Sequence, residues 1–200
     1  MKKIITVSRQ FGSGGRSIAK EIAASLGYDY YDSELSAKVA EETGFDPSYI
    51  ADAGEYAPGR SILSYAFGNA TAHGPSGHMS ATDYLWATQS RIINELAEKG
   101  NCVIVGRCAD FILRDREDCL NVFIHANEDY KAKRIVELYG VRDKSPKKRL
   151  EEKDAKRRTN YKYFTGREWG NIQNYHISLD SSALGNDACV KIITEMAKAL

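Results

Sequence analysis

Apolar and polar residues follow two kinds of pattern along the chain, and each pattern predicts one kind of element. A short apolar stretch at 4–8 predicts a β-strand, and apolar residues at 18, 19, 22, 23 and 26 recur at the spacing of one helical face. Because strand and helix patterns alternate along almost the whole chain, the sequence predicts an α/β fold with a mostly parallel sheet covered on both faces. Further strands are expected at 28–31, 102–105, 120–125 and 175–180, and further helices at 33–43, 85–97 (with Asp83 as N-cap), 127–139, after Pro146 and from Asn186.

The pattern weakens between residues 45 and 82, where Gly, Ala, Ser and Tyr are frequent and no element is predicted. A chain of 200 residues, of which 42% are hydrophobic, suits one compact domain. We therefore predict a single domain over 1–200, with 45–82 as an insertion over its functional site.

Composition argues against two classes of binding partner. The chain has 28 Lys and Arg against 27 Asp and Glu, and a net charge of +1 does not indicate a nucleic-acid or membrane binder. The apolar stretch near the N-terminus is too short for a signal peptide, and no apolar run approaches the roughly 20 residues of a membrane-spanning helix. We expect a cytoplasmic protein that binds neither nucleic acid nor membrane, with its four cysteines reduced.

A glycine-rich loop, Phe11 to Gly15, lies between the first predicted strand and its helix. Such a loop presents backbone N–H groups at the positive end of a helix dipole, and glycine lets the chain approach a ligand closely. These properties suit a phosphate group. The other interpretation is an ordinary tight turn, but the position between strand and helix is the one that phosphate binding requires.

The window from Gln10 to Ser17 differs from the phosphate-loop consensus, which is Gly, four residues, then Gly-Lys-Ser/Thr. Gln10 replaces the first glycine, and Arg16 replaces the lysine that would reach the β- and γ-phosphates. Arginine keeps the positive charge but delivers it through a planar fork, so the replacement changes the geometry of the contact. Ser17 keeps the hydroxyl that would face a magnesium ion.

Positive charge is concentrated in one later segment. Residues 142–168 contain eleven Lys and Arg against five Asp and Glu, a local charge of +6, whereas the rest of the chain is acidic. A solvent-exposed helix face is the ordinary interpretation of such a run. Beside a phosphate loop, the segment could instead be a basic lid at 142–169 that closes over a transferring phosphoryl group, neutralises its charge and excludes water.

Three blocks of the sequence resemble the cytidylate kinase-like family, a branch of the P-loop nucleoside monophosphate kinases. The resemblance implies a P-loop kinase fold with a five-stranded parallel sheet, Mg2+ with ATP as the phosphoryl donor, and a nucleoside monophosphate as the acceptor. The segment 45–82 would then contribute to acceptor binding. The blocks read ITVSRQFGSGGRSIAKEIAASLGYDYYD (5–32), VIVGRCADFIL (103–113), and DAKRRTNYKYFTGREWG (154–170) followed by NYHISLDSSALG (174–185).

The resemblance also implies roles for individual residues. Arg16 takes the place of the loop lysine, and Ser17 takes that of the magnesium ligand. Asp32 falls where related kinases place a group near the acceptor or the magnesium ion, and Arg107 matches an arginine that faces the acceptor phosphate. The residues that match the ATP phosphate loop are Gly12, Ser13, Gly14, Gly15, Arg16 and Ser17, and those that match the catalytic lid arginines are Arg157 and Arg158.

Some features depart from the family pattern or have a second interpretation. Cys108 follows Arg107 where true cytidylate kinases have an aspartate, so cytosine recognition is not implied, and no aspartate closes the 102–105 strand. Asp32 could cap the 33–43 helix instead of serving the site. The aromatic residues of the lid could stack a base, although packing of the lid is the better interpretation; they are Tyr161, Tyr163, Phe164 and Trp169.

These observations favour a phosphotransferase that moves the γ-phosphoryl of ATP to a nucleoside monophosphate by positioning and charge neutralisation. Two alternatives stay open: a non-catalytic ATP-binding regulatory module that lost the loop lysine, and a kinase that acts on another small acceptor. RNA binding through the basic segment is a weaker alternative, because no RNA-binding module is recognisable. The acceptor and the oligomeric state do not follow from the sequence.

Overall fold

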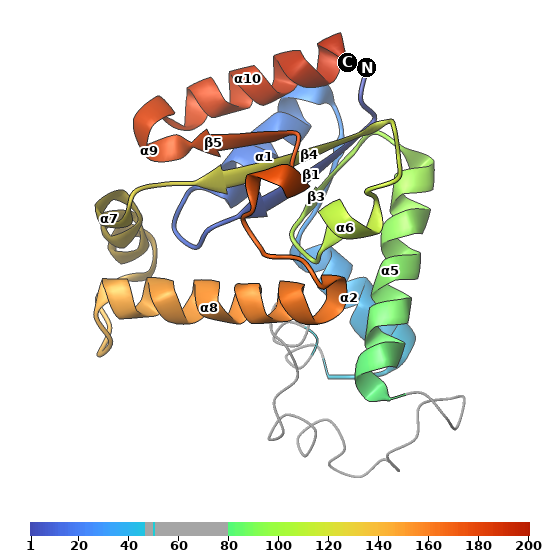
Figure 1. Cartoon of the computed structure of the whole chain (residues 1–200), viewed down its shortest axis with the longest axis horizontal. Helices are drawn as coiled ribbons and strands as arrows, with labels where there is room; N and C mark the ends of the chain where they lie inside the picture. Colours follow the sequence, from blue (N-terminus) through green and yellow to red (C-terminus); the bar gives the residue numbers. More distant parts are fainter. Residues whose placement is uncertain (47–49, 51–79) are drawn as a thin grey trace.

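The computed structural model describes residues 1–46, 50 and 80–200, which form a parallel five-stranded sheet with helices on both faces (Figure 1). The predicted fold is confirmed. The segment 47–49 and 51–79 lies outside the described residues, and most of the predicted insertion at 45–82 falls within it. The strands are β1 (Ile4–Arg9), β2 (Asp29–Tyr31), β3 (Cys102–Val105), β4 (Cys119–His125) and β5 (Ile177–Asp180), in the order β2-β3-β1-β4-β5.

Each long helix that the periodicity predicts is present within a few residues of its expected bounds. Among the described residues, the three shortest helical elements, α6, η1 and α9, were not predicted, because a single turn is too short to show a period. The elements are α1 (Gly15–Leu26), α2 (Ser33–Thr43), α5 (Ala81–Lys99), α6 (Ala109–Ile112), α7 (Glu128–Tyr139), α8 (Pro146–Thr165), the 3-10 turn η1 (Ile172–Asn174), α9 (Ser181–Leu184) and α10 (Asn186–Ala199).

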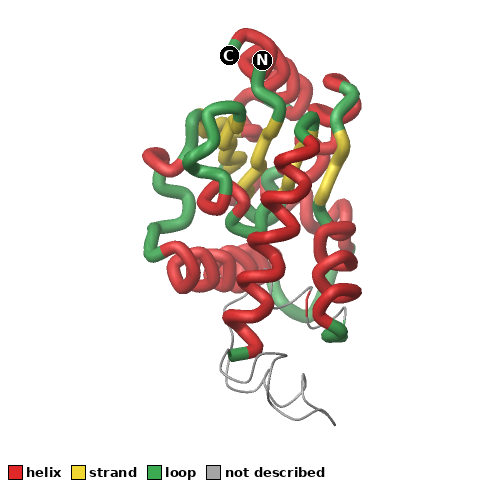
Figure 2. The backbone as a smooth tube through the Cα atoms, turned by 90° about the vertical axis from the view of Figure 1, so that its right-hand side faces the viewer, coloured by secondary structure: helices red, strands yellow, loops and turns green. Residues whose placement is uncertain are grey.

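The core has two halves, one on each face of the sheet, because successive residues of a strand point to opposite faces. In β3, Cys102 and Ile104 belong to a buried cluster with α2 and α5, whereas Val103 and Val105 belong to a second cluster with α1 and α10. Figure 2 shows the strands side by side between these helices. Both faces are therefore dry, as expected of a parallel sheet. No helix of the described residues is long and apolar enough to span a membrane.

The start of α5 corrects one prediction. Ser80, not Asp83, is the N-cap, because the Ser80 side chain accepts a hydrogen bond from the backbone N–H of Asp83 at 3.1 Å. The Ser80 hydroxyl also donates to the Asp83 carboxylate at 2.7 Å. Asp83 lies in the first turn of α5, where its negative charge interacts favourably with the helix dipole. Gly27 is the C-cap of α1 and is left-handed, with φ of 67°.

The basic segment, residues 142–168, forms α8 beyond the carboxyl end of the strands, and α8 crosses below the sheet in Figure 1. Ser145 caps α8 by accepting a hydrogen bond from the backbone N–H of Lys148, and Pro146 is the first residue of the helix. The lid aromatics pack against the domain: Phe164 stacks on Trp86 of α5 with ring centroids 4.5 Å apart. Packing, the better of the two interpretations of these aromatics, is confirmed for this residue.

A buried carboxylate ties the far half of α8 to the sheet. Asp110, at the start of α6, accepts hydrogen bonds from the Tyr161 hydroxyl at 2.6 Å and from the Ser8 hydroxyl at 3.3 Å. Burial raises the pKa of Asp110 above its usual range, and the two hydrogen bonds counteract that rise only in part. Burial and the neighbouring Asp110 also raise the pKa of Tyr161. This carboxylate thus anchors the C-terminal half of α8 to β1 and α6.

Loss of the Tyr161 donor should destabilise the fold. Tyr161→Phe removes a hydrogen bond to a buried acid, and we expect the free energy of unfolding to fall by about 1 to 3 kcal/mol. Denaturant unfolding followed by circular dichroism measures the change. Tyr163→Phe is the matched control, because Tyr163 is two residues away and exposed. Equal losses in the two variants would contradict the anchoring role of Asp110.

Asp110 should also give the protein a characteristic pH dependence. Its folded-state pKa is raised, so the folded chain holds this proton more tightly than the unfolded chain does. The contribution of Asp110 to stability therefore falls as pH rises from about 4, the unfolded-state pKa, through the folded-state pKa. Asp110→Asn should show a shallower decline over that window. Parallel slopes for the variant and the native protein, in unfolding titrations at several pH values, would count against this assignment.

Candidate active site

A cavity of about 480 Å3 opens at the carboxyl end of the sheet, beside the glycine-rich loop between β1 and α1. Its volume falls in the range of small-molecule sites. Of the described residues, six cationic side chains and one carboxylate line it, so this part of the site attracts anions. The lining residues are Arg9, Gln10, Phe11, Gly12, Gly14, Gly15, Arg16, Ser17, Asp32, Ser33, Ser36, Ala37, Arg107, Arg134, Leu138, Tyr139, Lys153 and Arg157.

The loop has the backbone geometry of an anion site. Gly12 and Gly14 both have φ of 82°, in the left-handed region that favours glycine. Gly14 is the N-cap of α1 and makes no side-chain cap, so the first N–H groups of α1 face the cavity without intrahelical acceptors. A Cβ on Gly12 would lie 2.9 Å from Cγ2 of Ile135, so this glycine also permits close packing against α7.

Ser13 differs from the rest of the predicted phosphate loop. Its side chain is fully buried and its hydroxyl is directed at the carbonyl oxygens of Gln10 and Ile124, at 2.9 and 3.1 Å. Its own carbonyl accepts from the Ser181 hydroxyl at 2.6 Å. Ser13 therefore attaches the loop to the ends of β4 and β5, and its side chain does not line the cavity.

Asp32 lies in the cavity at the end of β2. It occupies the N-cap position of α2 but makes no capping hydrogen bond, so helix capping, one of its two interpretations, is wrong. Its carboxylate instead pairs with Arg16, Nε to Oδ2 2.8 Å, and lies 3.8 Å from Nη2 of Arg9. Burial and the Asp32 charge raise the pKa of the adjacent Tyr30 to about 12. Asp32 is a counter-charge for the cations of the loop.

Arg107 extends into the cavity from the turn after β3. Gly106, Arg107 and Cys108 all have positive φ, at 72°, 58° and 53°, and such a left-handed run is costly for residues other than glycine. The guanidinium of Arg107 donates to the Ser36 hydroxyl at 2.6 Å and to the Ile50 carbonyl at 3.1 Å. Cys108, in contrast, is buried, and burial raises the pKa of its thiol.

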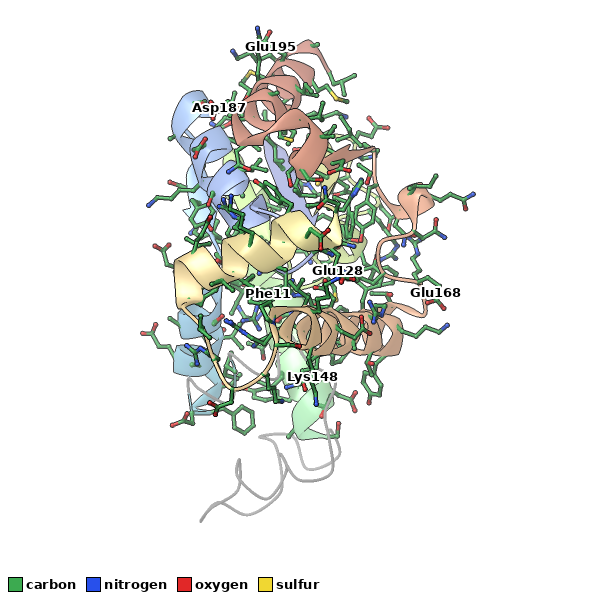
Figure 3. All side chains as sticks on the ribbon, turned by 90° about the vertical axis from the view of Figure 1, so that its left-hand side faces the viewer. Phe11, Glu128, Lys148, Glu168, Asp187 and Glu195 are labelled. Carbon is green, nitrogen blue, oxygen red and sulfur yellow. The ribbon has the colours of Figure 1, made fainter. Side chains whose placement is uncertain are left out.

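The α8 helix contacts the glycine loop through one face. Arg157 donates to the backbone carbonyl of Arg9 at 3.0 Å, and the Asp154 carboxylate accepts the backbone N–H of Phe11 at 2.8 Å. Figure 3 shows Phe11 between α7 and α8. Arg158 does not share this arrangement: its guanidinium pairs with Glu151 at 2.6 Å and does not line the cavity.

Three cationic residues of the cavity were not assigned a role from the sequence. Arg9 closes the first strand, Arg134 lies on α7 and Lys153 lies on α8. The available signal for Arg9 was a charged residue at the end of an otherwise apolar strand, directly before the glycine loop. Arg134 offered no signal, because a lysine- and arginine-rich helix is ordinary on a protein surface.

The residues present fit a magnesium ion that arrives with phosphate. Within 1–46, 50 and 80–200, no three His, Cys, Asp or Glu residues are grouped to hold a metal. Mg2+ in kinases, however, takes most of its ligands from phosphates and water, with one or two from the protein. The Ser17 hydroxyl and the Asp32 carboxylate both line the cavity and could supply these. The Ser17 hydroxyl accepts a hydrogen bond from the Arg134 guanidinium at 3.1 Å. Arg134 would have to move away for Ser17 to bind the ion.

Comparison with known proteins agrees with the fold. The chain is 21% identical over 199 residues to the cytidylate kinase of Methanopyrus kandleri, covering 95% of this chain and 90% of that protein. Among solved structures, an uncharacterized protein from Eubacterium ventriosum is 25% identical with a TM-score of 0.74, over 98% of this chain and 99% of that one. Shikimate kinase from Bacteroides thetaiotaomicron shares the fold at 16% identity, with a TM-score of 0.54 over 99% of both chains.

A family model extends this agreement across most of the sequence. The model for the cytidylate kinase-like family matches residues 4–183, from the first strand to the helix after the last strand. That range contains the glycine loop, Asp32, Arg107 and the whole of α8. The chain belongs to the cytidylate kinase-like family.

Proposed function

We propose that this protein transfers the γ-phosphoryl group of ATP to a nucleoside monophosphate. The observation that carries the proposal is one cavity that joins a glycine loop at a helix N-terminus to the guanidinium of Arg107, with five further cations among its described lining residues. Family membership and the P-loop kinase fold support a phosphotransferase that binds a nucleotide. The identities of the phosphoryl donor, ATP, and of the acceptor, a nucleoside monophosphate, go beyond that support and are what we propose.

The glycine loop is the proposed donor site. Its helix N-terminus favours an anion, and its glycines allow phosphate oxygens to approach the backbone. The proposed phosphate contacts are the backbone of Gly12, Gly14, Gly15, Arg16 and Ser17, together with the side chains of Arg16 and Ser17. Mg2+, when bound, would neutralise oxygens of two phosphates and orient them, with Ser17 and Asp32 as the protein residues that would hold it.

Arg107 and Asp32 mark the proposed acceptor side. The cavity contains a single carboxylate among its described lining residues, and that carboxylate is engaged by Arg16 and Arg9. An acceptor hydroxyl would need a base to remove its proton, whereas the phosphate of a nucleotide is mostly deprotonated at neutral pH. A nucleoside monophosphate therefore suits this site better than an alcohol does.

The proposed step needs no nucleophile from the protein. An oxygen of the acceptor phosphate bonds to the γ-phosphorus of ATP while the bond from that phosphorus to the β–γ bridging oxygen breaks. ADP leaves, and the other product is a nucleoside diphosphate. Arg157, on the proposed lid at 142–169, and the cations of the loop stabilise the charge that spreads over the transferring group.

A coupled ADP assay tests the function. We expect ADP formation that depends on a nucleoside monophosphate, with CMP, dCMP, UMP and AMP compared as acceptors and with shikimate and gluconate as hydroxyl acceptors. Because Cys108 stands where cytidylate kinases have aspartate, we expect an altered or weak preference for cytosine. ADP formation only with a hydroxyl acceptor would overturn the acceptor class. ATP binding with no ADP formation would favour the regulatory module.

The two neighbouring lid arginines should differ in their effects. Arg157 lines the cavity and contacts the loop, so Arg157→Gln should lower kcat by about 100-fold, the scale of losing one transition-state donor. Arg158→Gln should cost less, because Arg158 pairs with Glu151 outside the cavity. Lys133→Gln, at an exposed site on α7, is the control for an unspecific loss of charge. Steady-state kinetics with thermal melting checks the comparison, and similar losses at 157 and 158 would contradict it.

A further inference from the structure

We propose that Arg9 supplies the cation of the phosphate loop, and that Gly15 stands where other loops of this type carry lysine. The inference deepens the proposed function, on which it rests for its catalytic meaning, by naming a phosphate-binding residue at the same site. From the sequence, Arg16 is expected in this role. The backbone of the loop favours a register one residue earlier.

The left-handed glycines define that register. In the consensus, four residues separate two glycines, and the lysine follows the second one. Gly14 has φ of 82° and caps α1, whereas Gly15 is an ordinary first residue of the helix with no positive φ. Gly14 is thus the glycine that the backbone requires. Counting back five residues from it reaches Arg9 as the first position, and counting forward one reaches Gly15 as the lysine position. The Ser/Thr position of the consensus is then Arg16, so the proposed role of Ser17 rests on its place in the cavity and not on this count.

Arg9 explains why residue 15 is glycine. A Cβ on Gly15 would lie 2.5 Å from Cβ and 3.0 Å from Cγ of Arg9, closer than side-chain carbons pack. Only one of positions 9 and 15 can therefore carry a side chain. The consensus places glycine first and lysine second; this chain places arginine first and glycine second. The side chain that fills the small volume beside the loop therefore comes from the end of β1 instead of from the start of α1.

The Arg9 guanidinium lies at the centre of the site. It lines both the main cavity and a small neighbouring cavity, and Arg107 and Arg157 are the other two cations that line both. A Cβ on Gly106 would collide with Nη1 of Arg9, so the turn that carries Arg107 also leaves room for this side chain. Arg9 therefore lies between the proposed donor loop and the proposed acceptor arginine.

Arg9 and Arg16 approach the same carboxylate, Asp32, from different environments. The side chain of Arg9 is 7% exposed, whereas that of Arg16 is 54% exposed. A buried cation interacts more strongly with a phosphate than an exposed one does, because water screens it less. Position and burial thus both favour Arg9 as the principal contact of the β- and γ-phosphates.

Binding of inorganic tripolyphosphate and of ADP, measured by calorimetry, tests the inference without depending on catalysis. We expect Arg9→Gln to weaken tripolyphosphate binding at least tenfold, and Arg16→Gln to weaken it less. Arg116→Gln is the matched control, because Arg116 is also ion-paired, to Asp118 and Glu98, but lies outside the cavity. Binding by Arg9→Gln within twofold of the native protein, a larger loss in Arg16→Gln, or no binding to the native protein would overturn the inference.

An exchange of the side chains at positions 9 and 15 is the second test, and it compares two variants with each other instead of one variant with the native protein. Arg9→Gly with Gly15→Lys rebuilds the consensus order, and we expect it to bind tripolyphosphate at least fivefold more tightly than Arg9→Gly alone. A double variant that binds no better than Arg9→Gly contradicts the exchange. ADP formation is measured in parallel: if the native protein forms no ADP with any acceptor, the proposed function fails, while tripolyphosphate binding still decides the role of Arg9.

Discussion

Repulsion among positive charges is the constraint around which the carboxyl end of this sheet is built. Among the described residues, six cationic side chains line one cavity, and like charges that share a cavity repel one another. Asp32 opposes this repulsion from the end of β2, and Asp154 opposes it from the lid. Both carboxylates also fix geometry, because each contacts the glycine loop or its first helix.

Asp154 has a further role in this arrangement. Its carboxylate accepts a backbone N–H of the loop at Phe11, on the side where α8 crosses the carboxyl end of the sheet. Burial raises the pKa of Asp154, and the Phe11 N–H and the Arg157 charge oppose that rise. The α8 helix is thus held near its middle by this carboxylate and towards its C-terminus by the Asp110 and Tyr161 pair. Two buried acids, some 44 positions apart in sequence, position one basic helix.

The fold could be predicted from the sequence because it depends on local periodicity. The strand, loop and helix of residues 4–26 each carry their own signal, and so does each later strand. The orientation of α8 could not be predicted, since this helix is polar all round and offers no apolar stripe to show which face is inward. Arg157 and Arg158 are indistinguishable in the sequence for that reason.

The loop register could not be read from the sequence either. Two adjacent glycines, Gly14 and Gly15, both satisfy the consensus, and the match through Gly15 has fewer departures. Only the backbone angle at Gly14 and the contact of Gly15 with Arg9 distinguish them. A glycine can be required by φ or by a neighbouring side chain, and these two causes look the same in a sequence.

The order of the strands has a consequence for how the chain folds. The central strand β1 comes from the first nine residues, yet its two neighbours, β3 and β4, begin at Cys102 and Cys119. During synthesis at roughly 5 to 20 residues per second, β1 therefore waits several seconds for a partner. Pairing over such sequence separations is slow, because the loop-closure entropy is lost before the contacts form. The contact of Arg157 with the Arg9 carbonyl spans 148 residues, so the catalytic end of the sheet is completed among the last parts of the molecule.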